Sequence, residues 1–411
     1  MKRVCGVMAA GRDDSSKLLG GECPESGDPL DECPDETRTQ PARVHTAGPC
    51  MSVSCRGGNY LGEREEINTS ASSPVGYRRC AFTPEDAMGY PRKLLVALED
   101  TPYYHCISRC VRRSWLWGRD DYAGKDFSHR KAWVLERLAQ LTQTFAIEVC
   151  AYAVMSNHYH LVLYVDHRRS VSWSEREVCV RWSRVFRVPP FVDDYLAGKL
   201  QGVAAELARA TIATWRARLC SISWFMKCMN EYLARRANAE DGCDGRFWEG
   251  RFKSQALLDE SGLLTAMAYV DLNPVRAGIA AKPEDCEYTS VYERIRSLRS
   301  SIRPRVPLRE FRRDRSDGER AIPFSLRDYL SLVDWAGRAV RSDGSFGRID
   351  SSLPPILVRL KIEPLAWSSA MARRPAIVGR ALGKLDRLRI HAQKLGQGWI
   401  RGSRMCAALF G

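Results

Sequence analysis

The chain has 411 residues, 45% of them hydrophobic, and a formal net charge of +14 at pH 7. This length predicts two or three domains, or one domain with long extensions, and the charge favours a polyanionic partner such as nucleic acid, although a soluble basic protein could carry it too. No apolar run approaches the roughly 20 residues of a membrane-spanning helix and no CxxC pair occurs, so we expect a cytoplasmic protein with reduced thiols, without membrane contact or a cysteine zinc site.

Residues 1–95 differ in composition from the rest of the chain. They are rich in Gly, Pro, Ser, Asp and Glu, and no apolar periodicity in them lasts two helical turns. Such a segment cannot bury enough apolar surface to offset the entropy lost on folding. We therefore expect a disordered or poorly ordered N-terminal extension.

The first strand is expected over residues 103–109, where apolar and polar residues alternate. Two cations, Arg109 and Arg112, stand at its end beside two tryptophans. This mixture suits phosphate contact with base stacking, although tryptophans more often belong to a core. Both arginines are therefore candidate DNA-binding residues.

A helix and a hairpin are expected next. Residues 128–145 carry apolar residues at helical spacing after Ser128, which can cap the helix. Residues 147–154 and 158–165 alternate as strands do, and the short turn between them predicts an antiparallel hairpin.

Two histidines open the second strand of this hairpin. Residues i and i+2 of a strand point to the same face, so His158 and His160 would project side by side, with Tyr159 turned into the core behind them. Paired neutral imidazoles suit a divalent cation. The structural alternative is two half-exposed histidines near a turn, and spacing alone does not separate the two interpretations.

The following segments complete a first folded domain. Patterning and capping predict helices over 172–186, 193–218 (broken near Gly198 or Gly202), 224–236 and 261–271, and a short strand over 255–258. Strand, helix, hairpin, helix and strand in this order indicate an α+β fold over residues 96–293, an antiparallel sheet with helices on one face.

Two basic segments follow this domain. Residues 294–320 carry ten arginines and few apolar groups, so we expect an Arg-rich linker. Residues 321–411 are expected to form a helical basic C-terminal region. That region could grip nucleic acid or could simply present a solvated basic face.

A single tyrosine, Tyr232, lies on the predicted helix 224–236. A tyrosine hydroxyl can attack a phosphate and form a covalent phosphotyrosine, whereas a water nucleophile would give plain hydrolysis. The structural alternative is an ordinary helix tyrosine in the core or on the surface.

Residues 245–254 combine glycines, aromatic residues and cations. Arg246, Arg251 and Lys253 could neutralise DNA phosphates, and Trp248 could stack on a base. The same side chains could equally be structural. We take these four as candidate DNA-binding residues.

These motifs resemble those of a known family. His158-Tyr159-His160 has the form of the His-hydrophobic-His motif of single-tyrosine HUH transposases, and the closer similarity is to REP-associated tyrosine transposases, a branch of the insertion-sequence transposases. Residues 104–109, 152–162, 245–254 and 269–278 share the resemblance, in the family's order. Together the four segments cover roughly residues 100–290.

The resemblance implies a ferredoxin-like domain that binds single-stranded or hairpin DNA and cleaves and rejoins it through a tyrosine. It also implies magnesium or manganese at His158 and His160, with Tyr232 as nucleophile. Tyr232 stands one residue away from the family's position, however, and Tyr269 is a reserve nucleophile. A third metal ligand is expected on the helix that carries Tyr232, and Asn238 is the nearest suitable residue.

Two alternatives to the transposase remain. One is a catalytically inactive DNA-binding protein of the same fold, and the other is a metal-dependent nuclease that uses water. The transposase and the inactive binder both need a basic groove, so the charge pattern does not separate these two. In each case we expect a monomer or a homodimer.

Overall fold

The computed structural model describes residues 96–111, 119–120, 124–313, 321–339, 355–372 and 379–411. The contacts divide the chain into residues 1–79 and residues 80–411, and all described residues belong to the second unit. The extension expected over residues 1–95 and the candidate Arg112 lie outside the described residues. Among the described helices, none combines the length and the apolar character that a membrane crossing requires.

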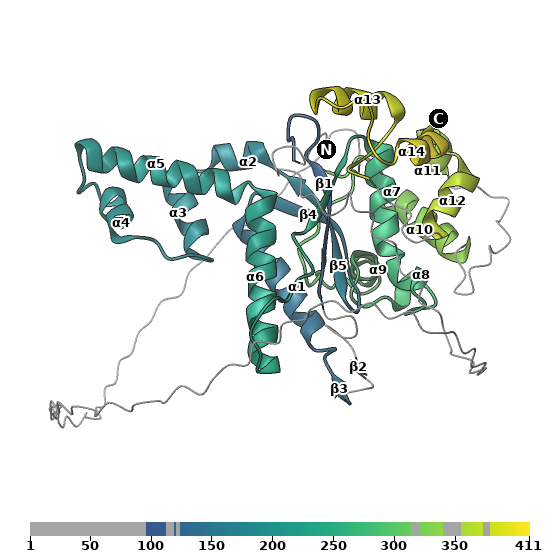
Figure 1. The fold of residues 1–411 in the computed structure, drawn as a ribbon, viewed down its shortest axis with the longest axis horizontal. Helices are drawn as coiled ribbons and strands as arrows, with labels where there is room; N and C mark the ends of the chain where they lie inside the picture. The colour runs from purple at the N-terminus through teal and green to yellow at the C-terminus, as the bar shows by residue number, and fades with distance from the viewer. Residues whose placement is uncertain (1–95, 112–118, 121–123, 314–320, 340–354, 373–378) are drawn as a thin grey trace, which may run out of the picture. The chain divides into compact units, whose positions relative to one another are not determined.

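A five-stranded sheet organises the described fold (Figure 1). Its strands run in the order β4 (Ile147–Val154), β5 (His158–Val165), β1 (Tyr103–Arg109), β6 (Lys253–Leu257) and β7 (Ala381–Leu382). The first four are antiparallel, as the sequence predicts, whereas β7 pairs parallel with β6. The sheet is therefore mixed and not purely antiparallel. A small separate ribbon pairs β2 (Arg119–Asp120) with β3 (Lys125–Asp126).

Helices make up most of the remaining regular structure, and the break predicted near Gly198 or Gly202 separates α4 from α5. In chain order they are α1 (Arg130–Thr144), α2 (His167–Ser172), α3 (Glu175–Ser183), α4 (Pro190–Leu196), α5 (Gly202–Leu219), α6 (Ile222–Asp241), α7 (Glu260–Asp271), α8 (Asn273–Arg276), the 3₁₀ turn η3 (Pro283–Asp285), α9 (Ser290–Ser300), α10 (Leu326–Ala339), α11 (Pro355–Leu360), α12 (Pro364–Ala372), α13 (Leu385–Lys394) and α14 (Ser403–Phe410).

Helices cover both faces of the sheet, which corrects the expectation of helices on one face. Tyr159 of β5 donates its hydroxyl to Asn230 of α6, whereas the next residue, His160, contacts Asn273 at the start of α8. Successive strand residues point to opposite faces, so α6 and α8 lie on opposite sides. The reason is visible in β4, whose residues are buried at every position except Glu148. A strand buried on both faces shows a near-continuous apolar run in place of alternation.

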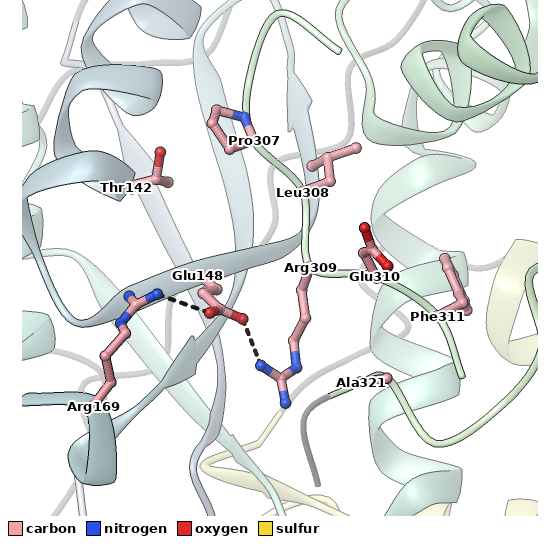
Figure 2. Close-up of a pocket in the computed structure, with 9 residues that line it drawn as sticks. All are labelled: Thr142, Glu148, Arg169, Pro307, Leu308, Arg309, Glu310, Phe311 and Ala321. Atoms are coloured by element: carbon pink, nitrogen blue, oxygen red, sulfur yellow. Dashed lines mark hydrogen bonds and ion pairs between the residues drawn. The ribbon is translucent and has the colours of Figure 1, made fainter. Parts of the chain in front are cut away.

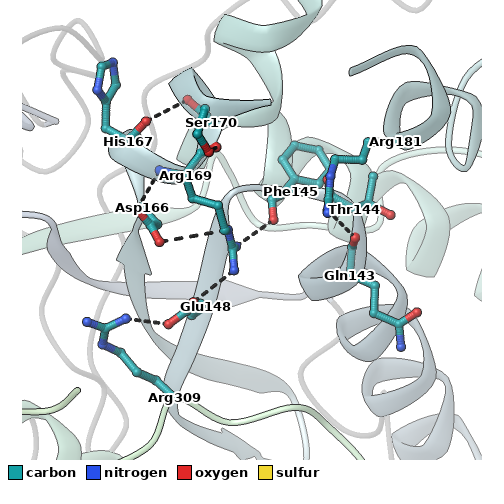
Figure 3. Close-up of polar contacts among 11 residues, drawn as sticks. Gln143, Thr144, Phe145, Glu148, Asp166, His167, Arg169, Ser170, Arg181 and Arg309 are labelled. Atoms are coloured by element: carbon teal, nitrogen blue, oxygen red, sulfur yellow. Dashed lines mark hydrogen bonds and ion pairs between the residues drawn. The ribbon is translucent and has the colours of Figure 1, made fainter. Parts of the chain in front are cut away.

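The segment expected to be an Arg-rich linker is instead packed against the sheet over its described part. It begins within α9, and Arg294 and Arg309 are only 7% and 4% exposed. The backbone N–H of Arg309 donates to the carbonyl of Val149, and its guanidinium pairs with Glu148 (Figure 3). Glu148 also holds Arg169 of α2 at 3.0 Å. Arg169 and Arg309 are therefore paired with a carboxylate, and the buried Arg294 donates to the carbonyls of Cys150 and Arg309, so all three have structural roles.

A cavity of about 330 Å³ lies beside this ion-pair cluster (Figure 2). Glu148, Arg169 and Arg309 line it together with apolar residues such as Pro307 and Phe311. Glu148 pairs in register with Tyr164 near the end of β5, whereas His158 is the first residue of that strand. The cavity thus lies at the opposite end of the strands from the histidine pair, and it is not part of the predicted site.

The C-terminal region is helical, as expected, but it joins the sheet through β7. The N–H of Ala256 donates to the carbonyl of Arg380, and the N–H of Leu258 donates to that of Leu382. Gly262 permits this approach, because a Cβ atom there would lie 2.4 Å from the Leu382 carbonyl oxygen. The region is therefore part of the same compact unit as the sheet.

Asp271 at the end of α7 should make stability depend on pH. Its buried carboxylate accepts hydrogen bonds from Ser290, Tyr329 and the N–H of Val291. Burial raises the pKa of Asp271 to about 6, although these hydrogen bonds oppose the rise. The pKa in the unfolded chain is about 3.9, so the folded chain binds this proton more tightly. The contribution of Asp271 to the free energy of unfolding should therefore fall by up to about 3 kcal/mol as pH rises from about 4 to about 6.

Urea unfolding of the parent and of Asp271→Asn at both ends of this pH range measures the effect. The amide cannot ionise, so the variant should gain stability relative to the parent as the pH is raised. A stability difference that is the same at both pH values would contradict the assignment.

Candidate functional site

The histidine pair lies where three strands meet at one end of the sheet. In the β1–β5 register, Arg109 stands opposite His158 and Ile107 stands opposite His160. The two imidazole rings share a face, as predicted, with centroids 4.9 Å apart. His158 is half-buried, whereas His160 is 3% exposed. Only His158 therefore borders the solvent.

A third histidine, His105 of β1, completes the group. Its Nε2 atom lies 2.9 Å from Nδ1 of His160, and the two rings stack with centroids 5.2 Å apart. His105 was not among the residues predicted for the site. The available signal was alternation, since His105, Ile107 and Arg109 share one face of β1, but the pairing of β1 with β5 was needed to bring His105 to His160.

Hydrogen bonds link four side chains in a row, and every donor in the row points the same way. We call this row the histidine chain: Gln255, His105, His160 and Asn273. The amide Nε2 of Gln255 donates to the carbonyl of Gly379 at 3.3 Å, so Oε1 of Gln255 faces Nδ1 of His105 at 3.4 Å. A carbonyl can only accept, and this fixes every later step. Nδ1 of His105 donates to Gln255, Nδ1 of His160 donates to Nε2 of His105, and Nε2 of His160 accepts from the Asn273 amide at 3.0 Å.

Both imidazoles of the histidine chain are neutral near pH 7. Burial lowers the pKa of His105 to about 4. Burial also lowers the pKa of His160 well below its usual value, and nearby groups that carry positive charge, among them His158, Arg276 and Arg109, lower it further. Neutral rings are what the fixed hydrogen-bond direction requires, since each ring both donates and accepts.

The residues present do not fit the predicted metal as they are arranged. A metal ligand needs an imidazole lone pair, and the one on His160 Nε2 accepts the hydrogen bond from Asn273. Asn238, the predicted third ligand, donates its amide to the carbonyl of Gly245 at 3.1 Å near the end of α6. Among the described residues, no group of three or more His, Cys, Asp or Glu side chains is placed to hold a metal ion. Metal binding therefore stays a prediction, and it would require Asn273 to move.

Replacing Asn273 by alanine should consequently increase affinity for a divalent cation. The change removes the donor from His160 Nε2 and leaves a lone pair beside the ring of His158. Titration with Mn²⁺, followed by electron paramagnetic resonance, should show tighter binding to Asn273→Ala than to the parent, and Asn238→Ala serves as the matched amide control. Equal Mn²⁺ affinity in the parent and in Asn273→Ala would show that Asn273 does not block the site.

The structure does not bring Tyr232 to the histidines. It lies on α6, which packs on the Tyr159 face of the sheet, opposite to that of His158 and His160. Its hydroxyl accepts a hydrogen bond from Arg236 at 2.6 Å, and its ring lies under the guanidinium of Arg137 from α1. The nucleophile assignment thus receives no support from the geometry.

The reserve tyrosine, Tyr269, is on the histidine side. It lies on α7, and its ring centroid is 5.9 Å from that of His160 and 6.2 Å from that of His105. The guanidinium of Arg276 covers its ring at 3.9 Å. With 7% exposure the side chain is buried.

The predicted DNA-binding residues separate into two groups. Trp248 is held in place, because its Nε1 donates to the carbonyl of Asn230 and its ring packs against Tyr159. Arg246 folds back on its own loop and donates to the carbonyls of Trp248 and Glu249. Both are therefore engaged in holding the 246–249 loop.

The other candidates form an exposed cationic edge. Arg109 ends β1, Lys253 begins β6, and Arg251 precedes it; all three are exposed. The N–H of Glu249 donates to the carbonyl of Arg109, which keeps this loop at the strand ends. Arg109 and Arg251 form no ion pair with another described residue. We call Arg109, His158, Arg251 and Lys253 the strand-end surface.

Comparison with known proteins gives one likeness. No family model matches the chain, and no curated protein matches it. Among solved structures, it is similar to that of a REP-associated tyrosine transposase bound to a REP hairpin, with 12% sequence identity and a TM-score of 0.28, over 54% of this chain and 92% of that one. A TM-score this low does not establish a shared fold, so the family expected from the sequence motifs stays a prediction.

Proposed function

We propose that this chain binds DNA through its strand-end surface, without a preassembled tyrosine and metal centre for cleavage. The observation that carries the proposal is the gathering of exposed cations at one end of the sheet, where Arg109 and Arg251 have no ion-pair partner among the described residues. Cations of this kind can be neutralised by phosphates at low cost, because no internal ion pair has to break.

The charge of the whole chain supports the same partner. A net charge of +14 gives long-range attraction to a polyanion. The buried Arg309 is paired with Glu148, and the buried Arg294 donates to the carbonyl of Cys150. Neither is exposed to a partner, whereas Arg109 and Arg251 are exposed. The strand-end surface includes His158, whose side chain is half-buried and can contact a bound strand.

The direct test is binding of the full chain to dye-labelled DNA at increasing salt. In a complex held by phosphate contacts, the logarithm of the association constant falls linearly with the logarithm of the salt concentration. The slope is about −0.7 per contacted phosphate for a single strand and about −0.9 for a duplex. A slope near zero, or no binding at low salt, would refute the proposal.

Strand cleavage is a second candidate, favoured by one observation: Tyr269 lies beside His160 on the face that the histidine pair shares. It requires the histidine chain to open, since His160 is hydrogen-bonded at both ring nitrogens. A protein–DNA adduct on a denaturing gel, formed on hairpin DNA with Mn²⁺ and lost in Tyr269→Phe or Tyr232→Phe, would establish cleavage and identify the nucleophile. Binding without an adduct is the result expected here.

A further inference from the structure

The C-terminal region continues the strand-end surface along the edge of the sheet. Because β7 runs parallel to β6 with Ala256 opposite Ala381, Arg380 lies next to Gln255. The Gln255 amide donates to the carbonyl of Gly379, one residue earlier. Gln255 stands only two residues after Lys253 of the strand-end surface. Residues 379–380 are therefore close neighbours of that surface.

The loop that contains Trp399 packs against Gly379. Gly379 has a φ of +155°, and a Cβ atom built there would lie 2.4 Å from the carbonyl oxygen of Arg401. Ile400 is 2% exposed and anchors the loop in the core. Gly396 and Gly402, both with positive φ, bound the loop where it leaves α13 and enters α14. Trp399 is thus presented by a backbone that is fixed on both sides.

Trp399 is 72% exposed, whereas every other tryptophan in the described part of the chain is buried or half-buried. Leaving a large aromatic ring in water forfeits the stabilisation that burial would give. The neighbouring charges indicate what could cover it. Residues 379–411 carry one acidic residue, Asp386, and Lys394 is paired with Asp100. The other cations of this segment are Arg380, Lys384, Arg387, Arg389, Arg401 and Arg404.

We propose that Trp399 is a base-stacking residue for single-stranded nucleic acid, on a path that runs from the strand-end surface over β7 to the Trp399 loop. An exposed aromatic ring among cations is the arrangement that proteins use for unpaired bases, where the ring stacks and the cations follow the backbone. Base pairs in a duplex are stacked on each other and do not offer a free face. This inference rests on the proposed function and names the form of nucleic acid that the surface prefers.

Fluorescence anisotropy of the full chain with two probes tests the proposal. The probes are a dye-labelled single strand of mixed sequence and the same strand annealed to its complement. Trp399→Ala should weaken single-strand binding by about 5- to 150-fold, the range seen for loss of one stacked base. The slope of affinity against salt should stay unchanged, because no phosphate contact is removed. Duplex binding should also stay unchanged.

Two further variants distinguish base stacking by Trp399 from an effect of the substitution on folding and from nonspecific hydrophobic binding. Trp399→Phe keeps an aromatic face and should retain most of the single-strand affinity. Ile390→Ala removes another exposed apolar side chain, on α13, and should change nothing. Equal single-strand affinity of Trp399→Ala and the parent would overturn the proposal, as would an equal loss on both probes. So would loss of binding to anionic phospholipid vesicles in Trp399→Ala with single-strand binding intact, since that result assigns the ring to a membrane surface.

The outcomes distinguish this inference from the proposed function. If alanine replacement of Arg109 and Arg251 weakens DNA binding and Trp399→Ala does not, DNA binding stands and the stacking role fails. If the parent binds neither probe at low salt, both fail together.

Discussion

Replacing Arg109 and Arg251 together by alanine is expected to weaken DNA binding on the order of 10- to 100-fold at about 0.1 M salt. Both side chains are exposed, and neither forms an ion pair with another described residue, so a bound phosphate is the partner that their positions allow. Loss of two phosphate contacts should also make the slope of log affinity against log salt concentration shallower by about 1.4 to 1.8, since each contact contributes about 0.7 to 0.9.

A control with equal charge loss is available elsewhere in the fold. Lys199 pairs with Asp194 at 3.2 Å and Arg235 pairs with Glu231 at 2.5 Å, both on exposed surface. The double variant Lys199→Ala, Arg235→Ala removes the same formal charge. If binding depends on the strand-end surface, the control keeps most of its affinity and its salt slope. If both double variants lose affinity equally, only net charge matters and no particular surface has been identified.

The sequence is a good guide to the hairpin that carries the histidines. Two apolar segments with a short turn between them predicted β4 and β5. The shared face of His158 and His160 was also predicted, because the period of two in a strand makes side-chain direction a local property. The break between α4 and α5 was also predicted, and both Gly198 and Gly202 have the positive φ that a side chain disfavours. These features depend on residues close together in the sequence.

What the sequence could not show depends on partners far along the chain. His160 meets Asn273 across 113 residues, and Gln255 meets Gly379 across 124. The first contact occupies the lone pair that a metal would need, and the second fixes the direction of every hydrogen bond in the histidine chain. Neither is visible in local pattern, so the histidine pair was predicted as a metal site from spacing that a buried hydrogen-bond chain satisfies equally well.

The two tyrosines show the same limit. Helical periodicity placed Tyr232 on a helix correctly, but which face of the sheet that helix covers is a tertiary property. Asn230 binds Tyr159 and thereby ties α6 to the face behind the histidines. Tyr269 was predicted only as a reserve nucleophile, yet α7 places it beside His160.

Removal of the Glu148 carboxylate is expected to have the largest effect on stability. The Arg309 side chain is 2% exposed and its guanidinium lies over the ring of Tyr164, so it cannot reach water when its partner is lost. Breaking a buried ion pair by removing one partner typically costs about 3 to 5 kcal/mol, because a desolvated charge is left behind. Glu148→Ala should therefore lower the free energy of unfolding by about that amount in urea denaturation.

A substitution of Arg309 distinguishes two causes of this loss of stability, the unpaired charge of Arg309 and the loss of side-chain packing. In the double variant Glu148→Ala, Arg309→Met, the thioether can fill space against Tyr164 and no buried charge is left unmatched. Arg169 also loses Glu148, but its side chain is 32% exposed and still faces Asp166. Replacing both members of a buried pair by apolar groups is often close to neutral, so the double variant should recover most of the lost stability. Glu310→Ala, on the rim of the same cavity and paired with the exposed Arg313, should change stability by no more than about 0.5 kcal/mol. A double variant less stable than Glu148→Ala would show that the guanidinium stabilises this edge of β4 by its contacts with Tyr164 and not through its charge.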